Sequence, residues 1–184
     1  QADIFPILRV LADRQPLPAK FLLLGSASPD LNKHISESLA GRVERITIGG
    51  FSLKEVGMNA YEKLWLRGGL PRAFLPRTNE ESFIWRKEFV QSFVARDLPM
   101  YGVSLPAMTI LRYWTMLAHY NGQVFNASEI ACSLGISEIT VKRYLDVMSG
   151  VFMVRQLQPW FANIKKRQVK APKIYFYDTG ILHA

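Results

Sequence analysis

This chain of 184 residues has little cysteine and lacks the residue spacings that bind metals. It contains one cysteine, Cys132, so no intramolecular disulfide can form and no Cys-x-x-Cys pair is present to hold zinc or a redox centre. Its three histidines lack the spacing of metal ligands. We therefore expect no metal site in this chain and a reducing, cytoplasmic location.

Long hydrophobic runs and targeting signals are also lacking. No apolar run approaches the roughly eighteen residues that a membrane-spanning helix needs. The N-terminus has neither a basic lead-in nor a small-residue cleavage site. Because 49% of the residues are hydrophobic, the chain still has enough apolar material for a folded core. The sequence predicts a soluble globular protein with no membrane partner.

Acidic residues are fewer than basic ones, and the formal net charge is +8. Residues 1–120 carry 15 Lys/Arg against 11 Asp/Glu, and residues 121–184 carry 8 against 4. Each part thus has the same excess, and the shorter C-terminal part is the more basic for its length. This distribution favours contact of the C-terminal part with an anionic partner.

The first fifty residues alternate between helical and strand patterns. Apolar residues recur at helical spacing from Ile4 to Leu11. The consecutive apolar residues 21–24 are typical of a strand buried on both faces of a parallel sheet, and residues 43–48 resemble a second strand. Two strands are too few for such a sheet. We interpret residues 1–50 as the last part of a larger α/β domain.

Residues 51–104 have helical patterns. Ser52 and Glu55 have the spacing of a capping box. The longest predicted helix has Asn79 as its candidate N-cap and ends near residue 98. One stripe of this helix is aromatic, and we expect it in the core. The stripe consists of Trp85, Phe89 and Phe93.

Residues 127–149 predict a helix-turn-helix. Ala131 is small where two helices would cross, and Gly135 lies where the chain must turn at positive φ. The first helix would cover residues 128–134, and the second would begin after an N-cap at Ser137. Cys132 lies inside this motif, where we expect a core residue and not a nucleophile.

Two strand-like segments follow, at residues 151–157 and 173–177, joined by a basic loop. Together with the helix-turn-helix they predict a winged helix within residues 105–184. In a DNA-binding version the residues in contact would be Thr140, Lys142, Arg143, Lys165, Lys166, Arg167 and Lys170. Glu138 and Asp146 oppose phosphate contact, and winged helices also bind proteins, so double-stranded DNA and a protein partner stay open as alternatives.

Five segments in order carry a resemblance to a known family. They are residues 21–28 (FLLLGSAS), 37–42 (ESLAGR), 51–56 (FSLKEV), 66–72 (LRGGLPR) and 173–182 (KIYFYDTGIL). This set is similar to a large family of prokaryotic AAA+ ATPases, archaeal-ATPase-like, in which a P-loop domain precedes a region of uncertain role. The resemblance implies a mainly α fold with an α/β remnant: the distal part of a P-loop AAA+ sheet, a helical lid over 51–104, and the winged helix-turn-helix.

The resemblance also implies ATP and Mg²⁺ as cofactors of a full-length protein, and a homo-oligomer as its assembly. The GxxxxGK[ST] phosphate loop and the acidic strand that holds Mg²⁺, the Walker A and Walker B motifs, are not in this sequence. We therefore expect the chain to be a catalytically incomplete fragment that neither binds ATP tightly nor hydrolyses it.

The resemblance assigns accessory roles to a few residues. Ser26 and Ser28 match sensor 1, which contacts the γ-phosphate or the attacking water, and Arg42 matches an arginine finger. Arg72 matches the lid arginine called sensor 2, with Arg67 as the alternative. Each has a plainer structural interpretation as a turn or surface residue. Asp178 is a lone carboxylate and predicts no metal-dependent nuclease.

Overall fold

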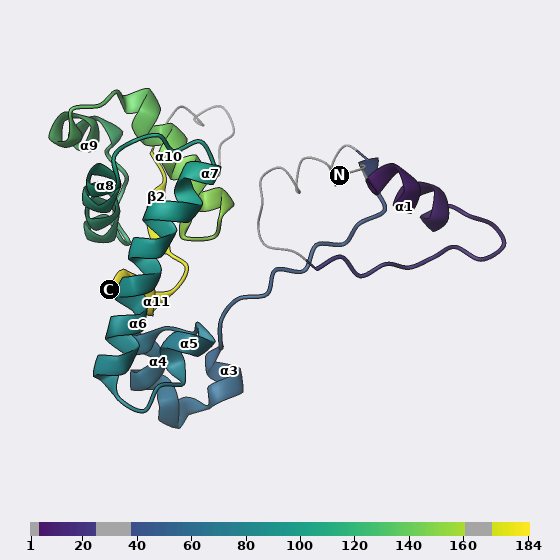
Figure 1. Cartoon of the computed structure of the whole chain (residues 1–184), viewed down its shortest axis with the longest axis horizontal. Helices are drawn as coiled ribbons and strands as arrows, with labels where there is room; N and C mark the ends of the chain where they lie inside the picture. Colours follow the sequence, from purple (N-terminus) through teal and green to yellow (C-terminus); the bar gives the residue numbers. More distant parts are fainter. Residues whose placement is uncertain (1–3, 25–37, 161–170) are drawn as a thin grey trace. The chain divides into compact units, whose positions relative to one another are not determined.

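The computed structural model describes residues 4–24, 38–160 and 171–184. The chain divides into two compact units, Gln1–Ile48 and Gly49–Ala184. The described residues are mainly helical, and their paired strands form one small antiparallel sheet in the second unit (Figure 1). The predicted division at residues 104 and 105 lies within this second unit and stays a prediction.

The described part of the first unit contains helix α1 (Phe5–Ala12), which starts with a proline in its first turn, where the missing N–H has no helical partner to lose. The predicted strands at residues 21–24 and 43–48 are not formed in the described residues. A strand needs a neighbouring strand for its backbone hydrogen bonds, and the described residues of this unit supply none. Leu22, Leu24 and Ile48 are 79%, 81% and 84% exposed.

Short helices open the second unit. They are α3 (Leu53–Val56), the 3₁₀ turn η1 (Met58–Ala60), α4 (Tyr61–Arg67) and α5 (Pro71–Phe74). The capping box at α3 is confirmed, because the backbone N–H of Ser52 donates to Glu55 Oε2 at 2.8 Å. The predicted cap of the next helix, α6 (Asn79–Ser92), was wrong by one residue. Thr78 is the N-cap, and its Oγ1 accepts from the N–H of Glu81 at 3.1 Å.

Helix α6 continues through the π-helical turn η2 (Phe93–Asp97) into α7 (Leu98–Met100). The predicted aromatic stripe is present along it: the ring centroids of Trp85 and Phe89 lie 5.3 Å apart, and those of Phe89 and Phe93 lie 6.1 Å apart. Phe93 is buried and meets Trp114 edge to face at 6.0 Å. The core prediction is thus confirmed for Phe93, and Phe89 packs against the core, whereas Trp85 is only partly buried and lies outside the core cluster.

The C-terminal helices are α8 (Ala107–His119), α9 (Ala127–Leu134) and α10 (Glu138–Gly150). Asn126 caps α9 by accepting the N–H of Glu129, and Ser137 caps α10 by accepting the N–H of Thr140. Gly135 takes the left-handed conformation (φ 67°) that the predicted turn requires. Both predicted helices and the predicted cap of the second are thus present.

The expectation that Cys132 is a core residue was wrong, because its side chain is exposed. In α9 the buried residues are Ala127, Ile130 and Ala131, so the inward stripe is narrow. Cys132 lies one position beyond that stripe.

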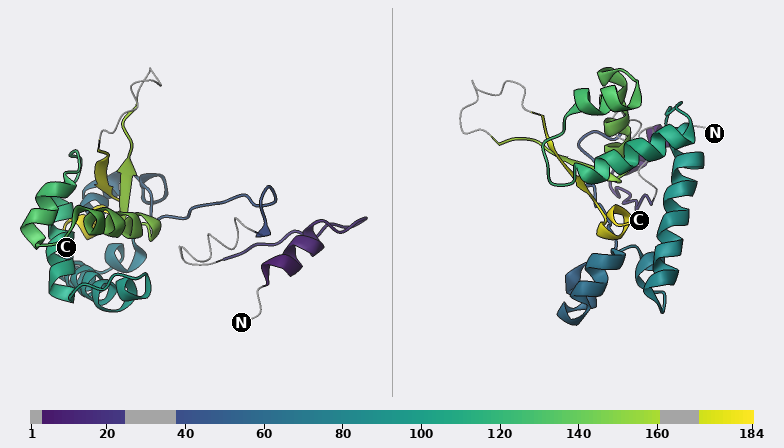
Figure 2. Two further views of the ribbon diagram at one scale, coloured as in Figure 1. Left: turned by 90° about the horizontal axis from the view of Figure 1, so that it is seen from above. Right: turned by 90° about the vertical axis from the view of Figure 1, so that its left-hand side faces the viewer.

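Strands β1 (Val154–Leu157) and β2 (Lys173–Phe176) form an antiparallel pair, which is followed by helix α11 (Thr179–Leu182). Single bridges also join Asn121 and Val124 to β2. The strands project from the helices of this unit in both views of Figure 2.

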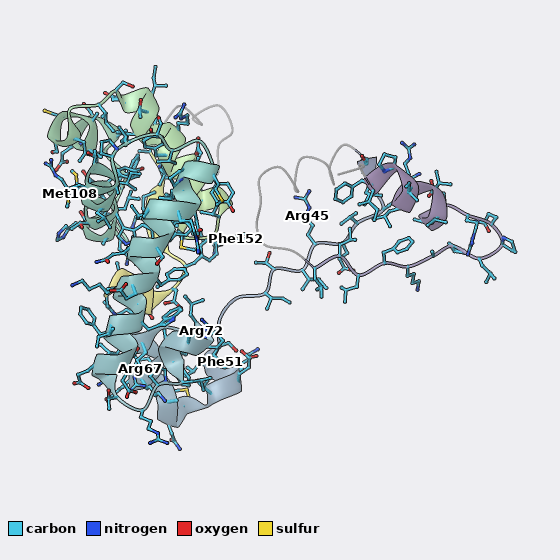
Figure 3. The ribbon with its side chains drawn as sticks, viewed as in Figure 1. Arg45, Phe51, Arg67, Arg72, Met108 and Phe152 are labelled. Atoms are coloured by element: carbon cyan, nitrogen blue, oxygen red, sulfur yellow. The ribbon has the colours of Figure 1, made fainter. Side chains whose placement is uncertain are left out.

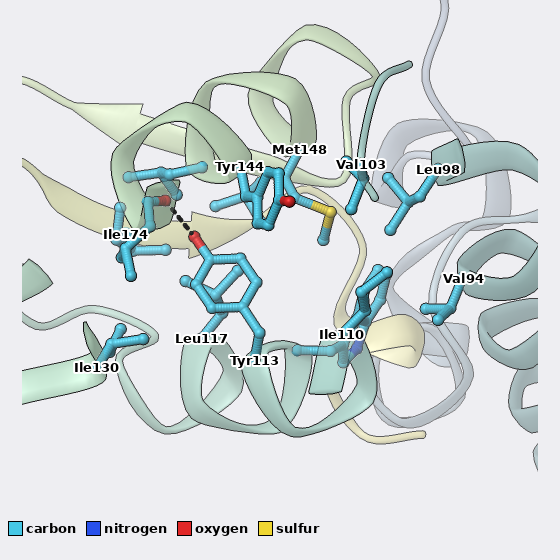
Figure 4. Packing of buried hydrophobic residues seen from close by; sticks show 14 of the residues in the cluster. Val94, Leu98, Val103, Ile110, Tyr113, Leu117, Ile130, Tyr144, Met148 and Ile174 are labelled. Atoms are coloured by element: carbon cyan, nitrogen blue, oxygen red, sulfur yellow. Dashed lines mark hydrogen bonds between the residues drawn. The ribbon is translucent and has the colours of Figure 1, made fainter. Parts of the chain in front are cut away.

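One hydrophobic core spans the second unit from α6 to α11, and Figure 4 shows part of it. Near its centre the hydroxyl of Tyr113 donates to the backbone carbonyl of Val141 at 3.0 Å, which links α8 to α10. Burial raises the pKa of this phenol above its ordinary value. The side chain is 1% exposed, so this hydrogen bond satisfies a polar atom that water does not reach.

Candidate functional site

Arg42 lies in the first unit and is paired with Asp13. Its Nε donates to Asp13 Oδ1 at 2.7 Å, and its Nη1 donates to the carbonyl of Ala40 at 3.1 Å. The hydrogen bond from Arg42 lowers the pKa of Asp13, and the same bond raises the pKa of Arg42. Both side chains are partly exposed, so solvent screens the pair and a phosphate is able to compete for the guanidinium. Ser26 and Ser28, the predicted sensor 1 residues, lie outside the described residues.

Arg72 lies on α5 beside a shallow surface hollow of about 470 Å³. The hollow is lined by Pro71, Arg72, Leu75, Pro76 and Trp85. Arg72 is exposed, and it has no hydrogen bond or ion pair with another described residue. Its guanidinium is thus available to an anion at the mouth of a largely apolar surface.

Arg67, the alternative to Arg72, is 5% exposed and its hydrogen bonds are used within the fold. Its Nε donates to Asn79 Oδ1 at 2.7 Å, and its Nη1 donates to the carbonyls of Phe74 and Pro76 at 3.3 and 2.5 Å. These contacts hold the turn between α5 and α6. Figure 3 labels Arg67 and Arg72 in this part of the second unit. Of the two arginines, Arg72 is the one whose guanidinium a ligand can reach.

Two segments that are far apart in the sequence meet beside Arg67. Asp178 Oδ2 accepts the backbone N–H groups of Gly69 at 2.7 Å and Leu70 at 3.3 Å. Asp178 Oδ1 accepts the N–H of Ile181 at 3.0 Å and so caps α11. These contacts of Asp178, together with Arg86 and Gly180, form a cluster that we call the buried junction.

Arg86 completes the buried junction from α6. Its Nη1 donates to the carbonyl of Gly180 at 2.6 Å. Burial lowers the pKa of the Arg86 guanidinium, while the charge of Asp178 acts in the opposite direction. A Cβ on Gly180 would collide with the carbonyl of Arg67, so the two segments approach as closely as a glycine allows.

Sequence reasoning missed this junction. It interpreted Asp178 as a lone carboxylate, because the partners of this side chain are backbone N–H groups, which leave no side-chain pattern in a sequence. The available signal was the Asp-Thr-Gly order, typical of a helix N-cap, and the Gly68-Gly69 pair. In the described residues, no group of three or more His, Cys, Asp or Glu side chains is placed to hold a metal ion.

The three predicted DNA-contacting residues of α10 have partners within the protein. Thr140 shares a hydrogen bond with the Ser137 hydroxyl at 2.9 Å, and Lys142 lies 3.6 Å from Glu138. Arg143 donates to the carbonyl of Gly102 at 3.0 Å. Lys165, Lys166, Arg167 and Lys170 of the predicted wing lie outside the described residues.

We compared the chain with known protein families, and the first match concerns its N-terminal part. Residues 2–57 match the family model described as "AAA domain", so the chain carries a fragment of an AAA-like ATPase. Residues 58–184 match the model described as "Domain of unknown function (DUF8612)". That match covers well over half of the chain, and the chain belongs to this family.

Two relatives are similar over nearly the whole chain. "Uncharacterized protein Mb2031c" of Mycobacterium bovis and "Uncharacterized protein Rv2008c" of Mycobacterium tuberculosis are each 55% identical over 181 residues. The match covers 98% of this chain and 41% of each relative, so the chain spans about two fifths of the length of these relatives. No solved structure gives a significant match. No helix among the described residues is long and apolar enough to cross a membrane.

Proposed function

We propose that the chain is the distal part of an AAA+ ATPase whose phosphate-binding half lies elsewhere in a longer protein. The observation that supports this proposal is the exposure of apolar residues in the first unit. Residues 21–24 and 43–48 belong to no helix or strand and are exposed, and exposed apolar segments of this kind are typical of strands that lack their neighbours. Their place within the "AAA domain" match supports the proposal that the remaining strands of the same sheet cover them in the longer protein.

Arg42 and Arg72 are the residues that we propose to act on ATP. Arg42 acts as the finger that stabilises the γ-phosphoryl charge at a neighbouring subunit, which requires a homo-oligomer and release of the Asp13 pair. Arg72 acts as the lid arginine, because its guanidinium is exposed and unpaired among the described residues. Ser26 and Ser28 would orient water, and ATP with Mg²⁺ would be bound by the remainder of the protein in the cytoplasm.

The experiment compares ATP binding and ATP turnover in the longer protein. We expect Arg42→Ala to lower turnover far more than affinity, because a finger interacts mainly with charge that develops in the transition state. We expect Arg72→Ala to weaken ATP binding. Arg77→Ala is the control for Arg72, since it is an exposed arginine close by in the sequence, and Arg9→Ala is the control for Arg42, since it is an exposed arginine of the same unit. Unchanged kinetics in both test variants would exclude the assigned roles.

A second candidate function is duplex DNA binding by a winged helix. It is supported by the capped helices α9 and α10, the antiparallel strands that follow them, and the single bridges that join Asn121 and Val124 to β2. Residues 121–184 also carry a net charge of +4. A protein partner is the alternative for the same fold.

The salt dependence of duplex binding tests this second candidate. Replacement of Lys165, Lys166, Arg167 and Lys170 with Gln should flatten the slope of log affinity against log salt by roughly 0.9 for each lost phosphate contact. Changes at Thr140 or Arg143 should instead alter the preference among sequences. Absence of duplex binding near about 50 mM salt would favour a protein partner.

A further inference from the structure

The two faces of the β1–β2 hairpin differ in chemistry. The register places Arg155 opposite Tyr175 and Leu157 opposite Lys173, and these four residues share one face because side chains alternate along a strand. Val154 and Phe176, which are also opposite one another, are buried on the other face. That inner face is directed towards α10, where Gln156 donates to Asp146 Oδ1 at 3.0 Å.

The outer face continues one step beyond β2. The N–H of Tyr177 donates to the carbonyl of Met153 at 3.1 Å, so the ladder extends and Tyr177 lies on the same face as Tyr175. Tyr177 is 50% exposed, and Phe152 meets its ring edge to face at 5.7 Å. Phe152 has a φ of 57°, a conformation that bulky residues rarely adopt. The ring of Phe152 thus lies beside that of Tyr177.

The outer face is also hollowed. A depression of about 380 Å³ is lined by Arg155, Leu157, Tyr175, Phe176 and Tyr177. Its volume is within the range of roughly 300–1,000 Å³ found for small-molecule sites, so a planar ring has room there.

The cations of this face are available to a ligand. The side chains of Arg155 and Lys173 are exposed and make no hydrogen bond or ion pair with any other residue that the structure describes. Nearby carboxylates are directed elsewhere, since Asp146 accepts from Gln156 on the inner face and Asp178 accepts from Gly69. On α10, by contrast, Lys142 and Arg143 already have partners.

We propose that this outer face, formed by Arg155, Lys173, Tyr175 and Tyr177, binds single-stranded nucleic acid. The two tyrosines are two residues apart on one strand, a spacing of about 7 Å, so each ring can stack on a separate base. Arg155 and Lys173 pair with the phosphates. A duplex keeps its bases within its own stack and would use only the cations, whereas a single strand uses both the rings and the charges. This proposal goes beyond the ATPase function and does not depend on it.

Fluorescence anisotropy with the 184-residue chain tests the proposal. The probes are a labelled oligo-dT of about 15 nucleotides and a duplex of the same length, both at about 50 mM salt. We expect saturable binding with preference for the single strand. Tyr177→Ala should weaken that binding about 5-fold or more, and Tyr177→Phe should leave it nearly unchanged because the stacking ring remains.

A matched pair of double variants tests the cations. Arg155→Gln with Lys173→Gln should lower the salt slope for the single strand by roughly 1.4, which corresponds to two lost phosphate contacts. Arg77→Gln with Lys87→Gln removes the same charge from exposed positions at and near α6 that have no proposed binding role, and it should leave the slope unchanged. Since all four side chains are exposed, thermal melts should show that both variants fold.

Three results would overturn the proposal. The first is no saturable binding of the oligo-dT, and the second is an equal loss in the two double variants, which would indicate only general charge attraction. The third is displacement of the oligo-dT by polyglutamate at equal charge concentration, which would indicate an acidic protein segment as the ligand. Because no ATP is present, each result is independent of the ATPase proposal.

Discussion

Asp178 accepts a hydrogen bond from the backbone N–H of Gly69 at 2.7 Å, and the two residues are 109 positions apart in the sequence. This bond connects the turn before α5 with the cap of α11. The segment that carries Arg72 is thereby attached to the segment that follows β2. The proposed nucleotide-contacting arginine and the β1–β2 hairpin therefore belong to one connected part of the second unit.

Loss of the Asp178 carboxylate should destabilise the second unit. Asp178→Ala leaves the N–H groups of Gly69, Leu70 and Ile181 without their acceptor, so we expect a loss of about 1–3 kcal/mol in the free energy of unfolding. Asp178→Asn keeps one acceptor oxygen and should lose less. Urea unfolding gives the measurement, with the exposed Asp146→Ala as control. Equal midpoints for the Asp178 and Asp146 variants would contradict this role.

The Gly180→Ala variant tests whether helix propensity or packing has the larger effect on stability at this position. Alanine is favoured over glycine within a helix by about 1 kcal/mol, so propensity alone predicts a more stable protein. The new Cβ would collide with the carbonyl of Arg67, and we therefore expect a net loss of about 1–3 kcal/mol. Gly49→Ala is the control, because nothing lies within 4 Å of a Cβ at that position. A stabilised Gly180 variant would show that the two segments separate easily.

Replacement of Arg67 should lower the stability of the fold much more than replacement of Arg72. Arg67→Met leaves the carbonyls of Phe74 and Pro76 without their donor in a buried place, and we expect it to cost about 2–4 kcal/mol of stability. Arg67→Lys should recover only part of this, because an ammonium lacks the fork of donors. Arg72→Met should change stability by less than about 0.5 kcal/mol. Chemical unfolding of the three variants measures these stabilities. Similar losses of stability at Arg67 and Arg72 would contradict the prediction.

Tyr120 should make the protein sensitive to alkali. Burial raises the pKa of its phenol to about 12, and the hydrogen bond that the hydroxyl donates to Glu129 Oε2 at 2.6 Å adds to this effect. Its contribution to stability is complete below pH 10, the ordinary value, and is lost as the pH rises through 12, because the unfolded chain releases the proton first.

Ultraviolet absorbance of tyrosinate measures this titration directly. The difference between the native chain and Tyr120→Phe should show one phenol that ionises near pH 12. Glu129→Gln should shift this step to lower pH, because the charged acceptor is removed while the burial remains. A Tyr120 phenol that titrates at pH 10 would contradict the expected environment.

The sequence alone determined the local features of this protein. The caps at Ser52 and Ser137, the turn at Gly135 and the lengths of α9 and α10 depend on residues within a few positions of one another, and short-range patterns predicted them. At the start of α6 the predicted N-cap, Asn79, was wrong by one residue, because Thr78 is the cap. The AAA-like character was also read from the order of motifs along the chain.

Only the tertiary structure decided which side chains are available and which are occupied. Arg67 and Arg72 stand five positions apart and are chemically alike, yet packing against α6 buries the first and leaves the second exposed. The role of Asp178 depends on N–H groups about a hundred residues away, and the outer face of the hairpin depends on its register. Strands at 21–24 and 43–48 failed as predictions for the same physical reason, because a strand is formed by its neighbours and not by its own residues.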